Sequence, residues 1–211
     1  MKILFLGCHC DDIELGCGGT IHKFSDRHDM LCVTLSIESV IKGQPLSLQQ
    51  QSEKALSHLG VKNLEYHDFV CNDFHKDRQL LWELLNRLDK AYKPDVVFTQ
   101  EQDFHQDHET LFLESIRNFR KATILSYKAS LRNSPNMSFN YYEALNKCDV
   151  LAKQKAISKY RFVQDGKETS FDSQLDYCKP LNIEAISRMA GISIEEEFAE
   201  GFNIIKGTGL L

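Results

Sequence analysis

The sequence predicts an α/β fold built around a mainly parallel sheet. Short apolar runs typical of buried strands alternate along the chain with amphipathic stretches typical of helices. Polar side chains of the kind that bind metals directly follow two of the predicted strands, as at the carboxyl ends of an open parallel sheet. The length of 211 residues suits one domain, which we expect to span residues 1–211.

The first third of the chain begins with a predicted strand, helix and strand, expected at Lys2–Gly7, Gly18–Asp26 and Met30–Ser36. Val40–Leu48 contains a glycine and a proline, which predicts a loop that borders the site. Gln49–Leu59 has apolar residues at helical spacing and is followed by Gly60, which is typical of a helix end. Leu64–Tyr66 then predicts a short strand.

A leucine-rich helix follows and ends at Lys93-Pro94, with leucines along one side at Leu80, Leu81, Leu84, Leu85 and Leu88. Trp82 lies on this helix, and we expect it in the core. Arg161–Pro180 is polar and weakly patterned, so no regular element is assigned to it. The other predicted elements are a strand at Asp95–Thr99, a helix at Glu109–Arg120, strands at Ala122–Tyr127 and Ser138–Leu145, a helix at Asp149–Tyr160 and a strand at Phe202–Lys206.

Composition excludes several classes of protein. The 25 Lys and Arg residues against 30 Asp and Glu residues give a net charge of −5, so we expect no nucleic-acid partner. No apolar stretch approaches the ~20 residues of a membrane span. Seven irregularly spaced cysteines do not suggest a disulfide framework and indicate a cytoplasmic protein. The number of subunits is open, a homo-oligomer being among the options.

Two clusters of ligand-type side chains follow two predicted strands. His9-Cys10-Asp11-Asp12 comes directly after the first strand, and His105-Gln106-Asp107-His108 follows a later one. Because the carboxyl ends of parallel strands line one crevice, the two loops can converge there. Imidazole nitrogen and carboxylate oxygen suit Zn²⁺, and a catalytic zinc site uses three protein ligands. A set drawn from His9, Asp12 and His108 meets this requirement.

The remaining polar residues of these clusters suggest acid–base chemistry. Asp11 is adjacent to a predicted ligand and is a candidate general base for a bound water. His105 is a candidate donor to a developing oxyanion or leaving group, with Asp107 orienting it. One such cluster alone is more often solvated surface, but two clusters that each follow a strand make coincidence the weaker explanation.

A run of glycines, Gly16-Cys17-Gly18-Gly19-Thr20, lies behind the first cluster. Its spacing differs from the dinucleotide-binding fingerprint. We interpret it as close backbone packing where the chain enters a helix. A helix that begins near Gly18 could also hold an anionic group of the substrate at its N-terminus.

The segment from His9 to Ile21 resembles the opening signature of the LmbE-like, PIG-L type zinc N-deacetylases, usually His-Pro-Asp-Asp followed by a Gly-x-Gly-Gly turn. His105-Gln106-Asp107-His108 resembles their second signature, His-x-Asp-His. Weaker similarity runs through Glu53–Val61, Lys155–Gln164 and Glu197–Phe202. The resemblance implies one LmbE-like deacetylase domain over residues 1–211, with a Rossmann-like three-layer sandwich and an active site at the carboxyl ends of the strands.

The resemblance also implies roles for individual residues. These are His9, Asp12 and His108 as zinc ligands, Asp11 as general base, and His105, supported by Asp107, as the group that stabilises the tetrahedral intermediate. The family removes acetyl groups from amino sugars, including glucosamine linked to inositol, phospholipid or malate. We therefore expect a zinc-dependent amidohydrolase that releases acetate from a small N-acetylated amino sugar, with nucleotide-linked and lipid-linked glycan precursors both open.

Three features depart from the family pattern, one of which is Tyr160-Arg161-Phe162-Val163-Gln164 in place of the usual Tyr-x-Ser-Gln. Cys10 replaces the usual proline, which places a thiol beside the metal loop, and we expect this thiol to be buried and inert. Gln50 stands where many members carry an arginine, and we expect it to contact the substrate. Since a neutral amide cannot replace bidentate guanidinium pairing, Gln50 argues against a charged clamp at this point.

Two alternatives stay open at this stage. One is a sugar- or nucleotide-binding module without catalytic activity, in which the acidic loop holds a structural ion. The other is a zinc hydrolase that uses the same site on other acyl groups.

Overall fold

The computed structural model describes residues 1–37, 46–130, 132, 136 and 138–207. The predicted loop at Val40–Leu48 lies mostly outside the described residues, and Leu48 begins a helix. The strands of the main sheet are β1 (Lys2–His9), β2 (Asp29–Ser36), β3 (Asn63–Tyr66), β4 (Val96–Gln100), β5 (Thr123–Tyr127), β6 (Tyr141–Leu145) and β9 (Phe198–Lys206). A separate hairpin consists of β7 (Arg161–Gln164) and β8 (Lys167–Ser170).

The described residues form a seven-stranded sheet in the order β3-β2-β1-β4-β5-β9-β6. Strands β1 to β5 are parallel to one another, whereas β9 runs antiparallel to both of its neighbours. The prediction of a mainly parallel sheet is therefore confirmed. In this order the first parallel strand, β1, lies between β2 and β4, so the ends of β1 and β4 are adjacent.

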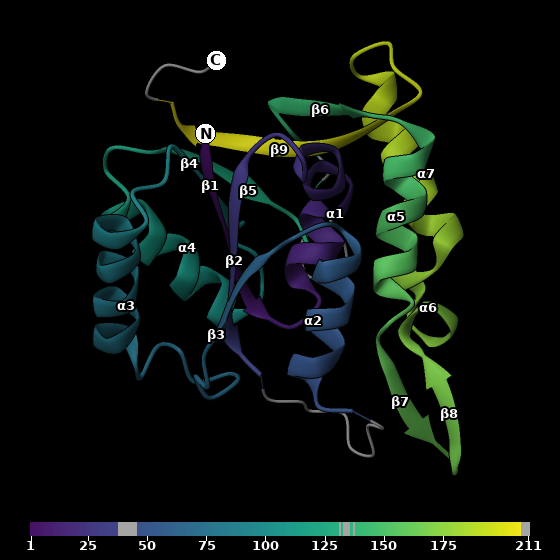
Figure 1. Ribbon diagram of the computed structural model, residues 1–211, viewed down its shortest axis with the longest axis horizontal. Coiled ribbons are helices and arrows are strands. Elements are labelled where there is room, and N and C mark those ends of the chain that lie inside the picture. The colour runs from purple at the N-terminus through teal and green to yellow at the C-terminus, as the bar shows by residue number, and fades with distance from the viewer. Residues whose placement is uncertain (38–45, 131, 133–135, 137, 208–211) are drawn as a thin grey trace.

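Helices cover both faces of the sheet, which gives three layers (Figure 1). Helices α3 (Arg78–Ala91) and α4 (Gln106–Asn118) lie on one face. The other face carries α1 (Asp12–Phe24), α2 (Leu48–His58), α5 (Lys147–Ile157) and α7 (Pro180–Ile192). A short helix, α6 (Phe171–Gln174), and a 3₁₀ turn, η1 (Asp176–Cys178), connect β8 to α7. Each face buries its own apolar cluster, so the predicted α/β class is correct.

Helix α1 begins six residues earlier than predicted, at Asp12 instead of Gly18. Its glycines lie inside the helix because neighbouring side chains approach its backbone closely. A Cβ at Gly16 would overlap the ring of Tyr127, and one at Gly18 would lie 3.0 Å from Cγ of Lys153. The packing interpretation of the glycine run is confirmed. The prediction that Gly18 begins a helix with an anion-binding N-terminus is wrong, because Gly18 is buried in the helix interior.

Three further predictions are corrected. Helix α4 begins at Gln106, so the second ligand cluster lies at the start of a helix. Trp82 is 40% exposed and not in the core, because the buried side of α3 is narrow and consists of Leu81, Leu84, Leu85 and Leu88. The segment after Arg161 contains the β7–β8 hairpin and α6, and the chain then forms α7, which the sequence pattern did not indicate. No helix in the described ranges has both the length and the apolarity that a membrane crossing requires.

Candidate active site

The two predicted clusters converge at the carboxyl ends of β1 and β4. His9 is the last residue of β1, and the loop after β4 leads into α4. A cavity of about 400 Å³ opens at this edge. Five residues predicted for the site line it, namely His9, Asp11, Asp12, His105 and His108. The sixth, Asp107, is buried directly behind them.

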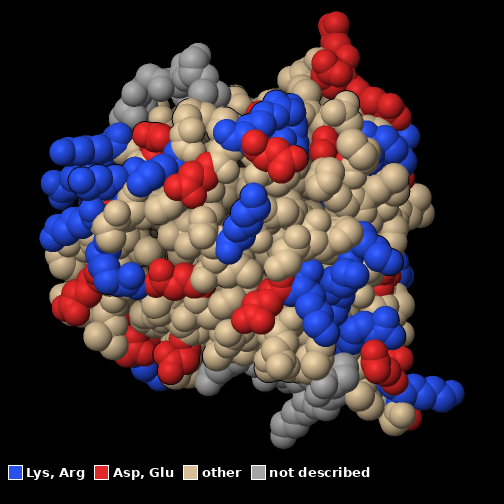
Figure 2. Space-filling model, in the orientation of Figure 1, with Lys and Arg blue, Asp and Glu red and all other residues tan. Residues whose placement is uncertain are grey.

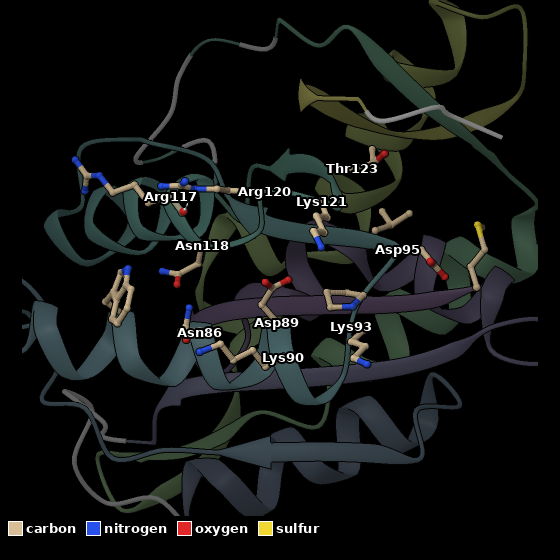
Figure 3. A pocket seen from close by; sticks show the side chains of 14 residues that line it. Asn86, Asp89, Lys90, Lys93, Asp95, Arg117, Asn118, Arg120, Lys121 and Thr123 are labelled. Carbon is tan, nitrogen blue, oxygen red and sulfur yellow. Dashed lines mark hydrogen bonds between the residues drawn. The ribbon is translucent and has the colours of Figure 1, made fainter.

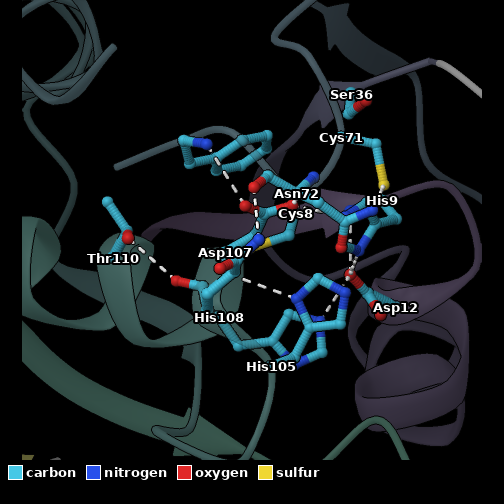
Figure 4. Close-up of polar contacts among 12 residues, drawn as sticks. Cys8, His9, Asp12, Ser36, Cys71, Asn72, His105, Asp107, His108 and Thr110 are labelled. Atoms are coloured by element: carbon cyan, nitrogen blue, oxygen red, sulfur yellow. Dashed lines mark hydrogen bonds and ion pairs between the residues drawn. The ribbon is translucent and has the colours of Figure 1, made fainter. Parts of the chain in front are cut away.

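Asp12 lies between two imidazoles (Figure 4). Its Oδ2 is 3.4 Å from Nδ1 of His9 and 3.8 Å from Nε2 of His108, and it also accepts the backbone N–H of His9 at 2.8 Å. Burial of Asp12 opposes ionisation, but His108 and the hydrogen bonds from His9 outweigh it and hold the pKa of this carboxyl well below its usual value. Asp12 is therefore an ionised carboxylate that joins both predicted histidine ligands.

The side chain of Asp107 contacts His9, while its backbone N–H, and not its side chain, contacts the His105 ring that Asp107 is predicted to orient. Its Oδ2 is 3.1 Å from Nε2 of His9, and its carboxylate also accepts the backbone N–H groups of Asn72 and Phe74. The reason is the early start of α4, which places Asp107 in the first helical turn with its side chain toward β1. Asp107 therefore orients the ring of His9 and fixes the loop around Asn72.

His105 is the N-cap residue of α4. Its Nδ1 accepts the backbone N–H of Asp107 at 3.2 Å, so a neutral ring carries its proton on Nε2. Burial and the neighbouring imidazoles of His108 and His9 lower the pKa of His105, which favours the neutral ring. His105 thus offers an N–H donor at the cavity without carrying a full charge.

Asp103 is a member of the site that the sequence analysis missed. Its Oδ2 is 2.8 Å from Nδ1 of His108, and its Oδ1 accepts the backbone N–H of His105 at 2.7 Å. Only 4% of its side chain is exposed. Because Nδ1 of His108 is held by a carboxylate, Nε2 is the nitrogen left facing Asp12. The only sequence signal was an acidic residue within five positions of a predicted histidine ligand.

Asp11 combines an unusual backbone conformation with an open carboxylate. It has a φ of 95°, and its side chain makes no capping hydrogen bond to α1. Burial raises the pKa of Asp11, and the nearby carboxylates of Asp12 and Glu14 raise it further, while His9 opposes them. An L-residue in this region costs of order 1–3 kcal/mol. The fold accepts this strain, and the result is a basic carboxylate that lines the cavity.

The donor atoms in this cavity fit a divalent ion. Within the described residues, three groups of side chains have donor atoms within 4.8 Å of one another: His9, His105 and His108; Cys8, Asp12 and His108; and His9, Cys71 and Asp107. The predicted set of His9, Asp12 and His108 is not one of these groups, although Oδ2 of Asp12 lies 3.4 Å and 3.8 Å from a ring nitrogen of the two histidines. Burial disfavours a charged His9 ring, but hydrogen bonds to Asp107 and Asp12 outweigh it and raise its pKa to about 12. The carboxylates of Asp107 and Asp12 thus stabilise a positive charge beside the ring of His9.

Of the two positions that depart from the family pattern near the site, Cys10 lines the cavity and Gln50 does not. Cys10 lines the cavity but is 3% exposed, and burial raises the pKa of its thiol, as expected for an inert group. Gln50 does not line the cavity within the described residues. It forms a capping box with Ser47 at the start of α2. The expectation that Gln50 contacts substrate therefore has no support in this geometry.

Much of the cavity wall comes from segments to which no element was assigned from the sequence. Its apolar and aromatic lining consists of Leu15, Leu48, Phe171, Leu175 and Tyr177. Its further polar lining consists of Asn72, Ser130 and Arg132. Such a wall suits a substrate with both apolar and hydrogen-bonding surface.

Comparisons with known proteins identify a family and a shared fold. The model of the PIG-L family, described as GlcNAc-PI de-N-acetylase, matches residues 4–116. Conserved protein TT1542 from Thermus thermophilus superposes with a TM-score of 0.74 at 21% identity, covering 99% of this chain and 96% of that chain. The N,N'-diacetylchitobiose deacetylase from Pyrococcus horikoshii, complexed with its inhibitor MPG, gives 0.71 at 20% identity, covering 97% and 83%.

A third solved structure, GalB, the 4-carboxy-2-hydroxymuconate hydratase from Pseudomonas putida, gives a TM-score of 0.74 at 13% identity, covering 100% of this chain and 98% of that chain. At these identities the three structures show a shared fold. The family model, by contrast, covers more than half of the chain and includes both ligand clusters. The resemblance seen in the sequence is thereby confirmed, and the chain belongs to the PIG-L family.

Proposed function

We propose that the protein is a metal-dependent N-deacetylase that hydrolyses the amide of an N-acetylated amino sugar. One observation carries the proposal. The carboxylate of Asp12 joins His9 and His108, while the carboxylate of Asp11, raised in pKa, lines the same cavity. Side chains suited to hold a metal and a carboxylate suited to act as general base thus line one cavity. Family membership supports the amide as the bond that is cleaved.

His9, Asp12 and His108 would hold the ion, and zinc is the best match to two imidazole nitrogens and a carboxylate oxygen. A bound divalent ion supplies Lewis-acid chemistry, since it polarises an amide carbonyl and lowers the pKa of water. Asp107 and Asp103 orient the two imidazoles through the nitrogens that face away from Asp12.

Asp11 takes a proton from the attacking water as the water oxygen bonds to the amide carbon. His105 donates a hydrogen bond from Nε2 to the oxygen that gains negative charge. The carbon–nitrogen bond then breaks, and the proton held by Asp11 passes to the leaving nitrogen. The products are acetate and a free amine, so every atom of the water is accounted for.

The size and lining of the cavity favour a small sugar derivative. About 400 Å³ lies within the usual range of small-molecule sites, roughly 300–1,000 Å³. Tyr177 and Phe171 offer aromatic surface against a sugar ring, and Asn72 and Ser130 offer hydrogen-bonding groups for its hydroxyls. The aglycone, whether nucleotide, lipid or neutral, would extend through the open side.

An acetate-release assay tests the proposal. Free N-acetylglucosamine and its neutral, nucleotide-linked and lipid-linked derivatives are incubated with the protein after chelation and after addition of zinc. We expect acetate and free amine in equal amounts, only with the metal, and at most a small fraction of that rate in Asp11→Asn. Asp26→Asn, an exposed aspartate far from the cavity, serves as the matched control.

Other outcomes would replace the proposal. Release of longer acyl groups but not acetate would identify a hydrolase of other acyl groups. Sugar binding without any product would identify a binding module. Because one protein of the same fold is a hydratase, water addition to an unsaturated acid with no amide cleavage would point to that chemistry.

A further inference from the structure

A second, larger groove lies at the opposite end of the sheet from the candidate active site. It is bordered by Asp95 and Val96, where β4 begins, by Thr123, where β5 begins, and by the last turns of α3 and α4. Its volume is about 1090 Å³. Figure 3 shows side chains from both helices facing each other across it. Nothing in the proposed deacetylation uses this groove.

The groove gathers positive charge on an acidic protein. Five of the 25 Lys and Arg residues line it, against two acidic residues, Asp89 and Asp95. The carboxylate of Asp95 already accepts the backbone N–H of Lys2 at 2.8 Å. In the space-filling view, basic side chains gather over the side formed by α3 (Figure 2). An anion in this groove would therefore meet a local positive field although the whole chain carries −5.

Several of these cations are available to a ligand. Within the described residues, Lys90 and Lys93 have no carboxylate partner. Arg120 donates through Nε to a backbone carbonyl, that of Arg117, and not to an acid. Arg117 itself differs, because it forms an ion pair with Glu114 at 2.6 Å. The charges of Lys90, Lys93 and Arg120 are thus left for an incoming anion.

Stabilisation of helix dipoles explains only part of this lining. Lys90 and Arg117 lie in the last turns of α3 and α4, where cations are favourable. Trp82 and Asn86 are uncharged, so the helix dipole does not explain their position in the groove. Trp82, Asn86 and Lys90 follow one another at intervals of one helical turn on the same side of α3, and the indole of Trp82 is 40% exposed. A large aromatic surface is therefore presented to solvent beside the cations.

We propose that this groove binds a mononucleotide that carries two or three phosphates. The base stacks on the indole of Trp82, and the amides of Asn86 and Asn118 face its polar edges. The phosphates lie toward Lys90 and Lys93. Eight residues of helix separate Trp82 from Lys90, about 12 Å along the axis, so ring and charge are recognised at opposite ends of the ligand.

A single nucleotide fits these observations better than a polymer or an acidic peptide. Only five of the 25 basic residues line this groove, and the net charge of −5 opposes a long phosphate backbone. An acidic peptide would use the cations but would leave the indole, the amide of Asn86 and Oδ1 of Asn118 without a matching partner. The groove volume of about 1090 Å³ lies just above the usual range of small-molecule sites, so the groove has room for a whole nucleotide.

The experiment uses the single tryptophan of the chain as its probe. Because Trp82 is the only indole, its fluorescence reports on this groove alone. The protein is titrated at physiological ionic strength with adenosine triphosphate, with inorganic tripolyphosphate, which has the charge without the ring, and with adenosine, which has the ring without the charge. We expect triphosphate nucleotide to quench the emission and to bind at least tenfold more tightly than either fragment, with calorimetry giving the same affinity.

Variants then separate the site from general charge. Lys90→Glu/Lys93→Glu should weaken nucleotide binding at least tenfold, whereas Lys54→Glu/Lys155→Glu changes the net charge equally at exposed positions elsewhere and should not. Trp82→Leu, followed by calorimetry, should also weaken it. No binding up to about 1 mM, the weak end of specific affinity, would overturn the proposal. Equal affinity for tripolyphosphate, or tighter binding of longer single-stranded RNA, would overturn it as well.

Discussion

Asp103 holds His108 through the nitrogen that faces away from Asp12, at 2.8 Å between Oδ2 and Nδ1. Asp107 holds His9 in the same manner, at 3.1 Å between Oδ2 and Nε2. Each predicted histidine ligand thus has one nitrogen bound to a buried carboxylate and the other directed toward Asp12. The arrangement sets which ring nitrogen is available to a metal before any ion binds.

Replacing Asp103 should therefore weaken metal binding. We expect Asp103→Ala to lower zinc affinity about 10–100-fold, the usual effect of losing such a partner, because the His108 ring can then rotate and change tautomer. Asp103→Asn keeps a hydrogen-bond acceptor but loses the charge, so its zinc affinity should lie between those of the unmodified protein and Asp103→Ala. Competition with a chromophoric chelator measures the affinity. Asp26→Asn serves as the control. If Asp103→Ala binds zinc as tightly as the control, Asp103 does not orient His108 for metal binding.

Asp11→Asn should separate catalysis from folding. Asparagine tolerates positive φ at least as well as aspartate, so the turn before α1 should keep its geometry at a φ of 95°. The substitution also removes a negative charge that Asp12 and Glu14 repel. We expect metal affinity to change little and the free energy of unfolding to be kept or to rise, while turnover falls about 10²–10⁴-fold. A variant that loses metal and activity together would indicate a ligand instead of a base.

The sequence was sufficient to predict both ligand clusters because each directly follows a strand of a parallel sheet. His9 ends β1, and the loop after β4 leads to His108 within a few residues. A local pattern of residues was therefore enough to predict that the two clusters meet in space, since neighbouring parallel strands bring their ends to one edge of the sheet. The contact between the Asp107 side chain and His9 was not predicted, because it depends on where α4 begins, which the pattern did not indicate.

Other parts of the site depend on contacts that no local pattern records. Asn72 reaches the site through its backbone N–H to Asp107, across 35 positions of sequence. Phe171 and Tyr177 come from a segment without clear periodicity that folds over the cavity. The start of α1 was misplaced because glycine has a poor helix propensity, which tertiary packing overrides here.

The glycines of α1 should differ sharply in their tolerance of alanine. At Gly16 the new Cβ would overlap the buried ring of Tyr127, whose hydroxyl is held by the backbone carbonyl of Leu6 at 2.7 Å. We expect Gly16→Ala to lower the free energy of unfolding by about 1–3 kcal/mol. At Gly18 the nearest atom is 3.0 Å away, on the flexible chain of Lys153, and alanine gains about 1 kcal/mol of helix propensity.

Gly18→Ala should accordingly be close to neutral. Denaturant unfolding of the two variants gives the comparison. Similar losses in both would mean that the packing around α1 is more uniform than the geometry indicates. Because Gly18 is buried away from any helix end, its substitution should also leave KM unchanged.

Substrate affinity should depend on the wall of the cavity and not on Gln50. Gln50 closes a capping box with Ser47, so Gln50→Ala should cost about 0.5–1 kcal/mol of stability and leave KM for an N-acetylated sugar unchanged. Tyr177 and Phe171 line the cavity, and removing either aromatic ring should raise KM several-fold, because ring surface that covers the sugar is lost. Steady-state kinetics on the best substrate of the acetate-release assay, with thermal unfolding in parallel, compares Gln50→Ala with Tyr177→Ala. An increase in KM for Gln50→Ala as large as that for Tyr177→Ala would restore Gln50 to the substrate site and require the start of α2 to move toward the cavity.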